Sequence, residues 1–538
     1  MNFDTSPPEN QKTIKFGIMC SGTNFQQWQA NAILSLLEHD RLECQLIIFH
    51  KKGQFKRKEK FKHFLWSQYF TLAKNRSRAV QTVDLSSKFM DTPSLNCQIQ
   101  KKGKFSEYFY DSDISEIEER NLDFILKFSR GIIRGKILDT AKYGIWSFHH
   151  DDEMKYRGRP ACFWEIYNQD CITGAILQRI TDKLDGGTVL KKGFFKTDDS
   201  YVKNRDRVYL ESAKWPKKVC VDILNNHADY FDREASSTKA PIYYLPTNAQ
   251  FLNFLFQQNL KKLQDSVRRL TLVNRASFGV ARTRIQSLPE KDEQPSIEWF
   301  STPPQGRSYF HPSALADGNQ LHIFLECYSE GDRKGTIAYT CYEDGRFSEL
   351  KIIINEEFSV SSPYILNVDS EIYMVLENRT ENKLLLYKST NFPLQWEIEK
   401  VAIENFTGTG NTLLHDRGIW WMFSSDRNDG ETYNLNLFYA DDLFGTWQPH
   451  PQNPVKTDVR SAKPAGTPFI SNGELYRPAV NFAQTELGRI TINQVRTMTQ
   501  EKYHEVECAE VLPDRIYHLW EAGDYTIIAG CQETFRAT

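Results

Sequence analysis

Three neighbouring segments decide the fold: LDFILKFSRGIIRGKIL at residues 122–138, KYGIWSFHHDDEMKYRGRPACFWEIYN at 142–168, and AILQRITDKLDGGTVLKKGFF at 175–195. Each segment carries a short apolar run bounded by glycine and charged residues, at 122–128, 144–148 and 174–180. Runs of this kind predict core strands of an α/β sheet. The second run stops at His149, and open α/β sheets place their chemistry where strands end. We therefore expect a site around His149.

Two further strands, at residues 14–19 and 43–50, flank a helical segment that begins near residue 25. This alternation predicts a doubly wound, mostly parallel sheet. The loop between the first strand and the helix consists of Ser21, Gly22, Thr23 and Asn24. Its backbone N–H groups and the helix N-terminus favour binding of a substrate phosphate. The alternative, an ordinary helix cap, is equally compatible with these residues.

The order of three motifs resembles the folate-dependent formyltransferase family, which includes the glycinamide ribonucleotide, methionyl-tRNA and sugar-amine N-formyltransferases. The motifs are His149 after its strand, then 156–158 (Tyr-Arg-Gly), then 184–187 (Leu-Asp-Gly-Gly). The usual pattern of the family is Asn-x-His-Pro-Ser, Tyr-Arg-Gly and Leu-Asp-Thr-Gly. Ser147 stands at the asparagine position. The resemblance implies a formyltransferase-like α/β domain over residues 1–235.

The resemblance also implies that a formyl group moves from 10-formyltetrahydrofolate to an amine. Such a transfer needs a base, a proton for the leaving nitrogen and a donor to the developing oxyanion. His149 can serve as the base or as the hydrogen-bond donor, Asp185 can orient its ring or relay protons, and Ser147 can donate one hydrogen bond. The folate is expected against the backbone of one loop, made of Arg130, Gly131, Ile132 and Ile133. In the alternative, His149 and Asp185 form a structural pair in a degenerate domain.

Residues 150–152 (His-Asp-Asp) are potential metal ligands. Consecutive residues rarely converge on one ion, so we expect a solvated loop here and no metal. The ten cysteines form no Cys-x-x-Cys pair, which also argues against a zinc site.

From about residue 275 onward the sequence changes to short β-rich runs that recur about every fifty residues. Four of them share one plan: residues 311–328, 361–378, 409–426 and 465–482. Each has a polar, glycine or proline start, a strand, a turn, and a strand rich in aromatic residues. A fifth unit is expected from residues 276–285 together with strands near 506 and 525. This pattern predicts an all-β five-bladed propeller over residues 275–538.

Residues 461–482 of this half resemble a five-bladed propeller module found beside some glycosyltransferases and related in shape to certain glycosidases. Such glycosidases need carboxylates at the inner ends of several blades. The first blade offers His311 there. We therefore expect a glycan-binding or scaffolding propeller, with Glu326 and Glu377 lining its centre. Glu377 and Arg477 are the candidate glycan contacts. The alternatives are that these residues only support packing, or that the propeller processes glycans itself.

Length and charge fit this two-part organisation. The chain has 538 residues, which is too long for one ordinary core, and residues 236–274 are expected to be a linker with an amphipathic helix at 249–270. The net charge is −2, so no overall field attracts nucleic acid. No apolar leader or membrane-spanning stretch is recognisable, and we expect a cytoplasmic protein.

Together the two halves predict N-formylation of an amine, most plausibly that of a nucleotide-linked amino sugar in surface-glycan synthesis, with the propeller binding the glycan or a partner. Two alternatives stay open. One is a non-catalytic glycan-binding or scaffold protein with a degenerate formyltransferase domain. The other is a propeller with its own glycan-processing activity. The oligomeric state is not predicted.

Overall fold

The computed structural model describes residues 12–50, 61–102, 106–129, 131–183, 186–288, 295–512 and 515–535. Two predicted site residues, Arg130 and Asp185, lie outside the described residues. The chain forms two compact units, Met1–Leu260 and Lys261–Thr538, which divide inside helix α7 (Asn248–Thr271). This helix covers the amphipathic segment expected from the sequence. No helix among the described residues has the length and apolarity required to cross a membrane.

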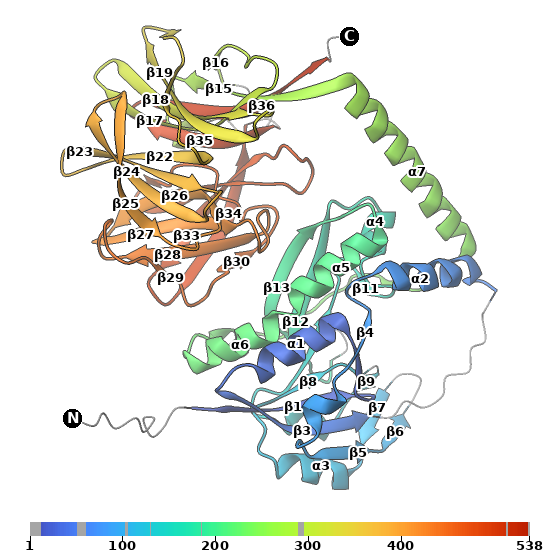
Figure 1. Ribbon diagram of the computed structural model, residues 1–538. Helices are drawn as coiled ribbons and strands as arrows, with labels where there is room; N and C mark the ends of the chain where they lie inside the picture. Colours follow the sequence, from blue (N-terminus) through green and yellow to red (C-terminus); the bar gives the residue numbers. More distant parts are fainter. Residues whose placement is uncertain are drawn as a thin grey trace, which may run out of the picture. The chain divides into compact units, whose positions relative to one another are not determined.

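Unit 1 is built on a seven-stranded sheet with the order β13-β12-β10-β8-β1-β3-β5 (Figure 1). Its strands are β1 (Ile14–Cys20), β3 (Leu42–His50), β5 (Ser94–Cys97), β8 (Phe124–Lys127), β10 (Ile145–His149), β12 (Ile172–Arg179) and β13 (Thr188–Lys196). The strands from β5 to β10 pair in parallel, whereas β12 and β13 are antiparallel. The predicted mostly parallel sheet is confirmed.

Helices cover both faces of this sheet. Trp28 of α1 packs with Phe128, Phe148 and Tyr209 on one face, and Ile117 of α3 packs against the other. The helices are α1 (Gln27–Leu37), α2 (Phe64–Arg76), α3 (Asp111–Glu118), α4 (Trp164–Tyr167), α5 (Tyr201–Ser212) and α6 (Trp215–Leu224). A proline in the first turn of a helix loses no hydrogen bond, so Pro216 starts α6 as a separate helix.

Unit 1 has three small sheets besides the main sheet, and two of them contain predicted site residues. In the first, β9 (Ile132–Ile133) pairs in parallel with β7 (Ser106–Phe109), which also pairs with β6 (Ile99–Lys102). In the second, β11 (Arg157–Gly158) pairs with β14 (Ile242–Tyr243). The loop expected to hold folate and the Tyr-Arg-Gly motif are therefore each fixed by strand pairing.

Gly158 should be irreplaceable by alanine, because its φ is +107° and an added Cβ would lie 2.0 Å from the carbonyl oxygen of Tyr243. We expect Gly158→Ala to lower the free energy of unfolding of unit 1 by more than about 1 kcal/mol. Urea unfolding measures the loss. Gly22→Ala is the matched control, since no atom lies within 4 Å of its added Cβ. Equal stability of the two variants would contradict this reading.

Unit 2 contains five antiparallel sheets, the blades of a five-bladed propeller (Figure 1). Blade 1 contains β17 (Arg307–Asp317), β18 (Gln320–Ser329), β19 (Lys334–Glu343), β20 (Arg346–Phe347) and β21 (Lys351–Ile354). Blade 2 contains β22 (Val360–Val368), β23 (Glu371–Asn378), β24 (Lys383–Asn391) and β25 (Gln395–Ile403). Blade 3 contains β26 (Gly408–Asp416), β27 (Ile419–Asp426), β28 (Asn434–Ala440), β29 (Gln448–Pro449) and β30 (Lys456–Thr457).

The last two blades complete the ring. Blade 4 contains β31 (Phe469–Ser471), β32 (Glu474–Val480), β33 (Ile490–Met498) and β34 (Tyr503–Val511). Blade 5 contains β15 (Leu272–Ala281), β16 (Glu298–Trp299), β35 (Ile516–Ala522) and β36 (Tyr525–Phe535). Pairing of β15 with β36 joins the two ends of the unit in one sheet. The strand near residue 506 was assigned to the fifth unit, but it is β34, which pairs with β33 in blade 4.

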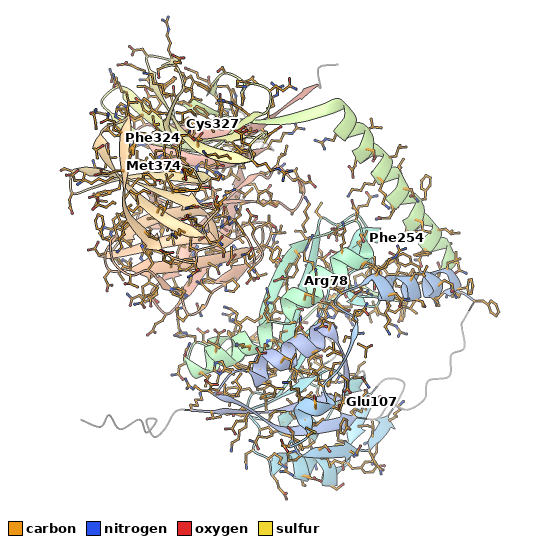
Figure 2. All side chains as sticks on the ribbon, in the orientation of Figure 1. Arg78, Glu107, Phe254, Phe324, Cys327 and Met374 are labelled. Atoms are coloured by element: carbon orange, nitrogen blue, oxygen red, sulfur yellow. The ribbon has the colours of Figure 1, made fainter. Side chains whose placement is uncertain are left out.

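Apolar side chains from alternate strand positions form the core of unit 2. Phe324 and Met374 have no exposed surface, and Cys327 belongs to the same cluster (Figure 2). Burial of apolar surface stabilises the folded state by roughly 25 cal/mol per Å². Because apolar side chains fill the middle of the blades, polar side chains are expected to cluster at the ends of the inner strands.

Candidate functional site

In unit 1, Ser147 and His149 lie two residues apart on β10 and so share one face of the strand. The ring nitrogen Nε2 of His149 donates to the carbonyl oxygen of Tyr156 at 3.2 Å, in the Tyr-Arg-Gly motif. Lys127 is the Cα partner of Ser147 on the adjacent strand β8. The structure therefore brings two motifs of the predicted site together and adds a lysine that the sequence analysis did not single out.

Lys127 is buried, and its ammonium donates to the carbonyl oxygens of Ser129 (2.7 Å) and Gly131 (3.1 Å). Glu107 packs against the same loop, because a Cβ added to Gly131 would lie only 1.8 Å from Oε2 of Glu107. The same oxygen lies 3.1 Å from Nε2 of His50. Burial lowers the pKa of Lys127 to about 8 and that of His50 to about 4. The loop expected to hold folate is thus held by side chains of its own unit.

His150 and Asp151 are buried and Asp152 is half-buried, so the predicted solvated loop is wrong. His150 bonds through Nε2 to Ser212 Oγ (3.1 Å), and Asp151 accepts the N–H of Cys162 (2.7 Å). Asp152 pairs with Lys192 at 3.3 Å. The three side chains have separate partners and do not converge. Among the described residues, no group of three or more histidine, cysteine or acidic side chains is placed to hold a metal.

Asp151 also meets Glu165, a residue that the sequence analysis did not identify. Glu165 has no exposed surface, and burial raises the pKa of both carboxyl groups. The two carboxyl groups are hydrogen-bonded to each other, so a protonated Glu165 can donate to the Asp151 carboxylate.

The loop 21–24 lacks the geometry expected for phosphate. Asn24 starts the short strand β2 (Asn24–Gln26), which pairs with β4 (Thr82–Asp84), and Gln26 caps α1. The helix N-terminus is therefore separated from residues 21–23. Hydrogen bonds from Ser86 and Thr23 lower the pKa of Asp84, so a carboxylate stands beside the loop. A negative charge there opposes an anion.

In unit 2, three blades open with the same irregularity. The inner strands β17, β22 and β26 each carry a two-residue bulge near their start: His311-Pro312, Ser362-Pro363 and Gly410-Asn411. His311, Ser362 and Gly410 have φ values of 47°, 51° and 66°. β22 contacts both β17 and β26, so the bulges lie at equivalent places of consecutive blades, at one end of the propeller. We call this region the central end.

Glu326 and Glu377 each tie one blade to the next. Oε2 of Glu326 accepts from His311 Nδ1 (3.3 Å) and from the N–H of Ser362 in blade 2 (3.4 Å). Oε1 of Glu377 accepts the N–H of Gly410 in blade 3 (2.8 Å). Both glutamates are buried, so their oxygens are engaged within the protein. An acid–base pair for glycan hydrolysis needs access to substrate, which this arrangement does not give.

The exposed groups of the central end come from the loops after the second strands. Arg379 follows β23 and pairs with Oε2 of Glu377 at 3.3 Å, with about a third of its side chain exposed. Burial by itself would lower the pKa of Arg379, but Glu377 and Glu326 raise it. In blade 3 the half-exposed Glu431 follows β27 and pairs at 2.8 Å with Lys463, which is itself buried. Sequence reasoning missed these residues because they lie in turns, outside the repeated strand pattern.

Arg477 lies elsewhere, inside blade 4. Its guanidinium has no exposed surface and pairs with both oxygens of Glu505, at 2.6 and 2.9 Å. It also donates to the carbonyl oxygen of Ser461 at 2.7 Å. A ligand has no access to this group, so the structure does not join Arg477 to Glu377 as a glycan contact.

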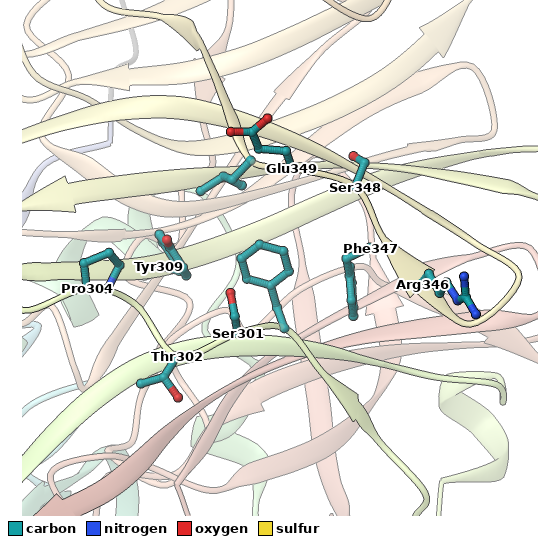
Figure 3. Close-up of a pocket in the computed structure, with 10 residues that line it drawn as sticks. Ser301, Thr302, Pro304, Tyr309, Arg346, Phe347, Ser348 and Glu349 are labelled. Carbon is teal, nitrogen blue, oxygen red and sulfur yellow. The ribbon is translucent and has the colours of Figure 1, made fainter.

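A separate open pocket of about 690 Å³ lies between the edges of blades 1 and 5 (Figure 3). Its floor contains Phe300, Phe347 and Tyr309, and exposed polar residues such as Arg346 and Glu349 form its rim. The aromatic rings pack edge to face, with Phe300 and Phe347 centroids 5.2 Å apart. No ion pair joins two of the residues that line this pocket, in contrast to the central end.

Fold and site define a two-unit protein: an α/β unit with formyltransferase-like motifs, and a five-bladed propeller with a charged central end. Residues 308–520 match the family described as glucosamine inositolphosphorylceramide transferase 1, N-terminal. Glucosamine inositolphosphorylceramide transferase 1 of Arabidopsis thaliana is 32% identical over 203 residues, which is 36% of this chain and 26% of that protein. The chain thus spans about a quarter of the length of this relative.

The N-terminal part is similar to methionyl-tRNA formyltransferases. That of Pseudothermotoga lettingae is 30% identical over 115 residues, covering 20% of this chain and 36% of that protein. Among solved structures, an α-L-arabinofuranosidase from Podospora anserina aligns over 42% of this chain and 92% of its own, with a TM-score of 0.33 and 9% identity.

These findings correct the function predicted from the sequence. The relatives with 30–32% identity over about a third of the chain are named glucosamine inositolphosphorylceramide transferases, and only weaker, shorter matches are formyltransferases. N-formylation of an amino sugar is therefore wrong as the main reading. The relatives are named transferases, and the two alternatives, a glycan-binding or scaffold protein with a degenerate formyltransferase domain and a propeller with its own glycan-processing activity, agree better with them.

Proposed function

We propose that the chain is a glycan-binding protein whose propeller holds the sugar head group of a glycan at its central end. The single observation that carries this proposal is the row of tied polar groups on consecutive blades. Glu326 and Glu377 fix the bulges, Arg379 and His311 are partly exposed beside them, and the buried Lys463 pairs with the half-exposed Glu431. Sugar hydroxyls need both donors and acceptors in fixed positions, and this row supplies them.

The matched relatives support this choice of ligand class. They match this chain in the propeller region, and their name combines glucosamine with inositolphosphorylceramide. In this proposal unit 1 serves as a scaffold, with Ser147 in place of the family's asparagine and its loop held by Lys127.

Arg379→Met should weaken binding of sugars about tenfold or more, because a hydrogen bond to a charged group is worth roughly 1.5–3 kcal/mol. The measurement is calorimetric titration of the full chain with D-glucose, D-glucosamine and myo-inositol. Arg417→Met is the matched control, since Arg417 is 88% exposed on the turn at the other end of β26. It should bind like the original protein.

Two results would overturn the proposed function. One is the absence of sugar binding by the unmodified chain, and the other is equal loss of affinity in Arg379→Met and Arg417→Met. Release of tetrahydrofolate from 10-formyltetrahydrofolate by the purified chain would contradict the scaffold role of unit 1 without touching the propeller.

A further inference from the structure

Helix α7 runs without a break over 24 residues (Figure 1) and carries apolar side chains on two faces. The first face packs on unit 1 through Phe251 and Phe254, which are buried in one cluster with Trp66 and Phe163. The ring centroids of Phe254 and Phe163 lie 4.9 Å apart. This contact holds the start of the helix against its own unit.

The second apolar face lies roughly opposite Phe254 on a helix of 3.6 residues per turn. It consists of five side chains, each 45–67% exposed: Leu252, Phe256, Leu260, Leu263 and Val267. Their spacing of three or four residues keeps them within an arc of about 80° and over a length of about 22 Å. We call this set the α7 stripe. Contiguous exposed apolar side chains mark a surface that binds a partner or a membrane.

Basic residues accompany the α7 stripe. Residues 261–269 contain four basic residues and one acidic residue. Lys262 and Arg268 each lie about 120° from the middle of the stripe, one on each side, whereas Asp265 lies on the opposite side of the helix. The alkyl part of a long basic side chain can lie along apolar surface while its charged end extends outward. An apolar stripe flanked by positive charge complements the boundary between acyl chains and anionic head groups.

Pairing of α7 with a second copy explains the sequence less well. A coiled-coil seam would run over residues 256–270, about two heptads, whereas a recognisable coiled coil extends over at least three or four. The positions that flank such a seam hold Gln257, Asn259, Gln264 and Ser266, which carry no charge to select a partner. A membrane accounts for the apolar stripe and for the basic residues together.

We propose that α7 binds the surface of an anionic membrane. The helix lies in the plane of the interface, with the α7 stripe among the acyl chains and with Lys262 and Arg268 beside the lipid phosphates. This inference goes beyond the proposed function and does not depend on sugar binding at the central end. It adds a second ligand, the lipid surface, to a part of the chain outside the propeller blades.

The test is co-sedimentation of the full chain with vesicles of phosphatidylcholine alone, or of phosphatidylcholine and phosphatidylserine in equal parts. We expect about tenfold tighter binding to the mixed vesicles, because each basic residue near an anionic surface strengthens binding about fivefold. Leu263→Gln should weaken this binding about tenfold or more, since an apolar side chain is lost from the acyl region. Ile470→Gln on β31 is the matched control, because Leu263 and Ile470 are both 63% exposed.

Two further measurements locate the interaction. Lys262→Gln should weaken binding to the mixed vesicles about fivefold and leave binding to phosphatidylcholine unchanged. Lys351→Gln, at an exposed lysine of β21, is its control. An excess of free O-phosphoserine should not release the chain, because a membrane surface and not a single head group is bound. Circular dichroism shows whether Leu263→Gln folds, and if it does not, Lys262→Gln decides.

Three results would overturn the inference: no binding to the mixed vesicles, equal binding by Leu263→Gln and Ile470→Gln, or release by O-phosphoserine. A dimer in sedimentation velocity that Leu263→Gln dissociates, in a chain that binds no vesicles, would assign the α7 stripe to a second copy instead. None of these results bears on sugar binding, so the proposed function stands or falls separately.

Discussion

Arg477→Met should lower the free energy of unfolding of the propeller by about 3–5 kcal/mol, the cost of leaving one partner of a buried ion pair uncompensated. Arg477 and Glu505 are at most 2% exposed and make two hydrogen bonds to each other, and the guanidinium also lies over the ring of Phe423. The measurement is urea unfolding, with hydrogen exchange of the β32 and β33 amides to assign the transition to unit 2. Arg496→Met, an exposed arginine on β33, is the matched control and should change stability by less than about 0.5 kcal/mol.

The pH dependence of the same pair has a defined sign. Burial alone would raise the pKa of Glu505, but Arg477 and Lys456 lower it from 4.5 to about 2. A carboxylate with a lowered pKa contributes stability above its unfolded pKa, and that contribution disappears as the pH falls from about 4.5 to about 2. In Arg477→Met this loss on acidification should be smaller. A variant as stable as the control at pH 7 would show that the pair contributes nothing.

The fold followed from local patterns that physical chemistry constrains strongly. Short apolar runs between glycine and charged residues became β8, β10 and β12, because a strand that is covered on both faces consists almost entirely of apolar residues. The propeller followed from four eighteen-residue runs of one plan, each of which became the first two strands of one of blades 1 to 4. The strand near residue 506 was misassigned because strand pairing, and not spacing, decides which blade a strand joins.

The site was harder to predict because its partners are partly backbone groups. Repeat equivalence pointed to Glu326 and Glu377, but no sequence pattern reports that each accepts an N–H from the next blade. Arg477 looked like a candidate because it is charged, and only the fold shows Glu505 beside it. In unit 1, the sequence places His149 at a strand end. Whether that strand end could form a formyl-transfer site depends also on Ser147 and on the position of Lys127, which only the structure shows.

His150→Phe should make unit 1 less sensitive to acid. His150 has its ring stacked on Tyr209 with centroids 3.9 Å apart, and burial lowers its pKa from 6.5 to about 3. Between these values the unfolded chain binds the proton and the folded unit does not, so the histidine makes stability fall as the pH falls. From pH 7 to pH 5 this amounts to about 2 kcal/mol. The stability advantage of the original protein over His150→Phe should shrink by that amount.

The comparison between two variants matters because nearby groups titrate in the opposite direction. Burial raises the pKa of Asp151 and Glu165, so their protonation favours the folded unit as the pH falls and partly hides the effect of His150. The difference between the original protein and His150→Phe cancels their contribution if the phenylalanine keeps the ring packing. Ser212→Ala removes the hydrogen-bond partner of His150 and keeps the titrating ring, so its stability should follow the pH slope of the original protein. Parallel unfolding curves for His150→Phe and the original protein between pH 7 and pH 5 would mean that the ring gains its proton in the folded unit as readily as in the unfolded chain.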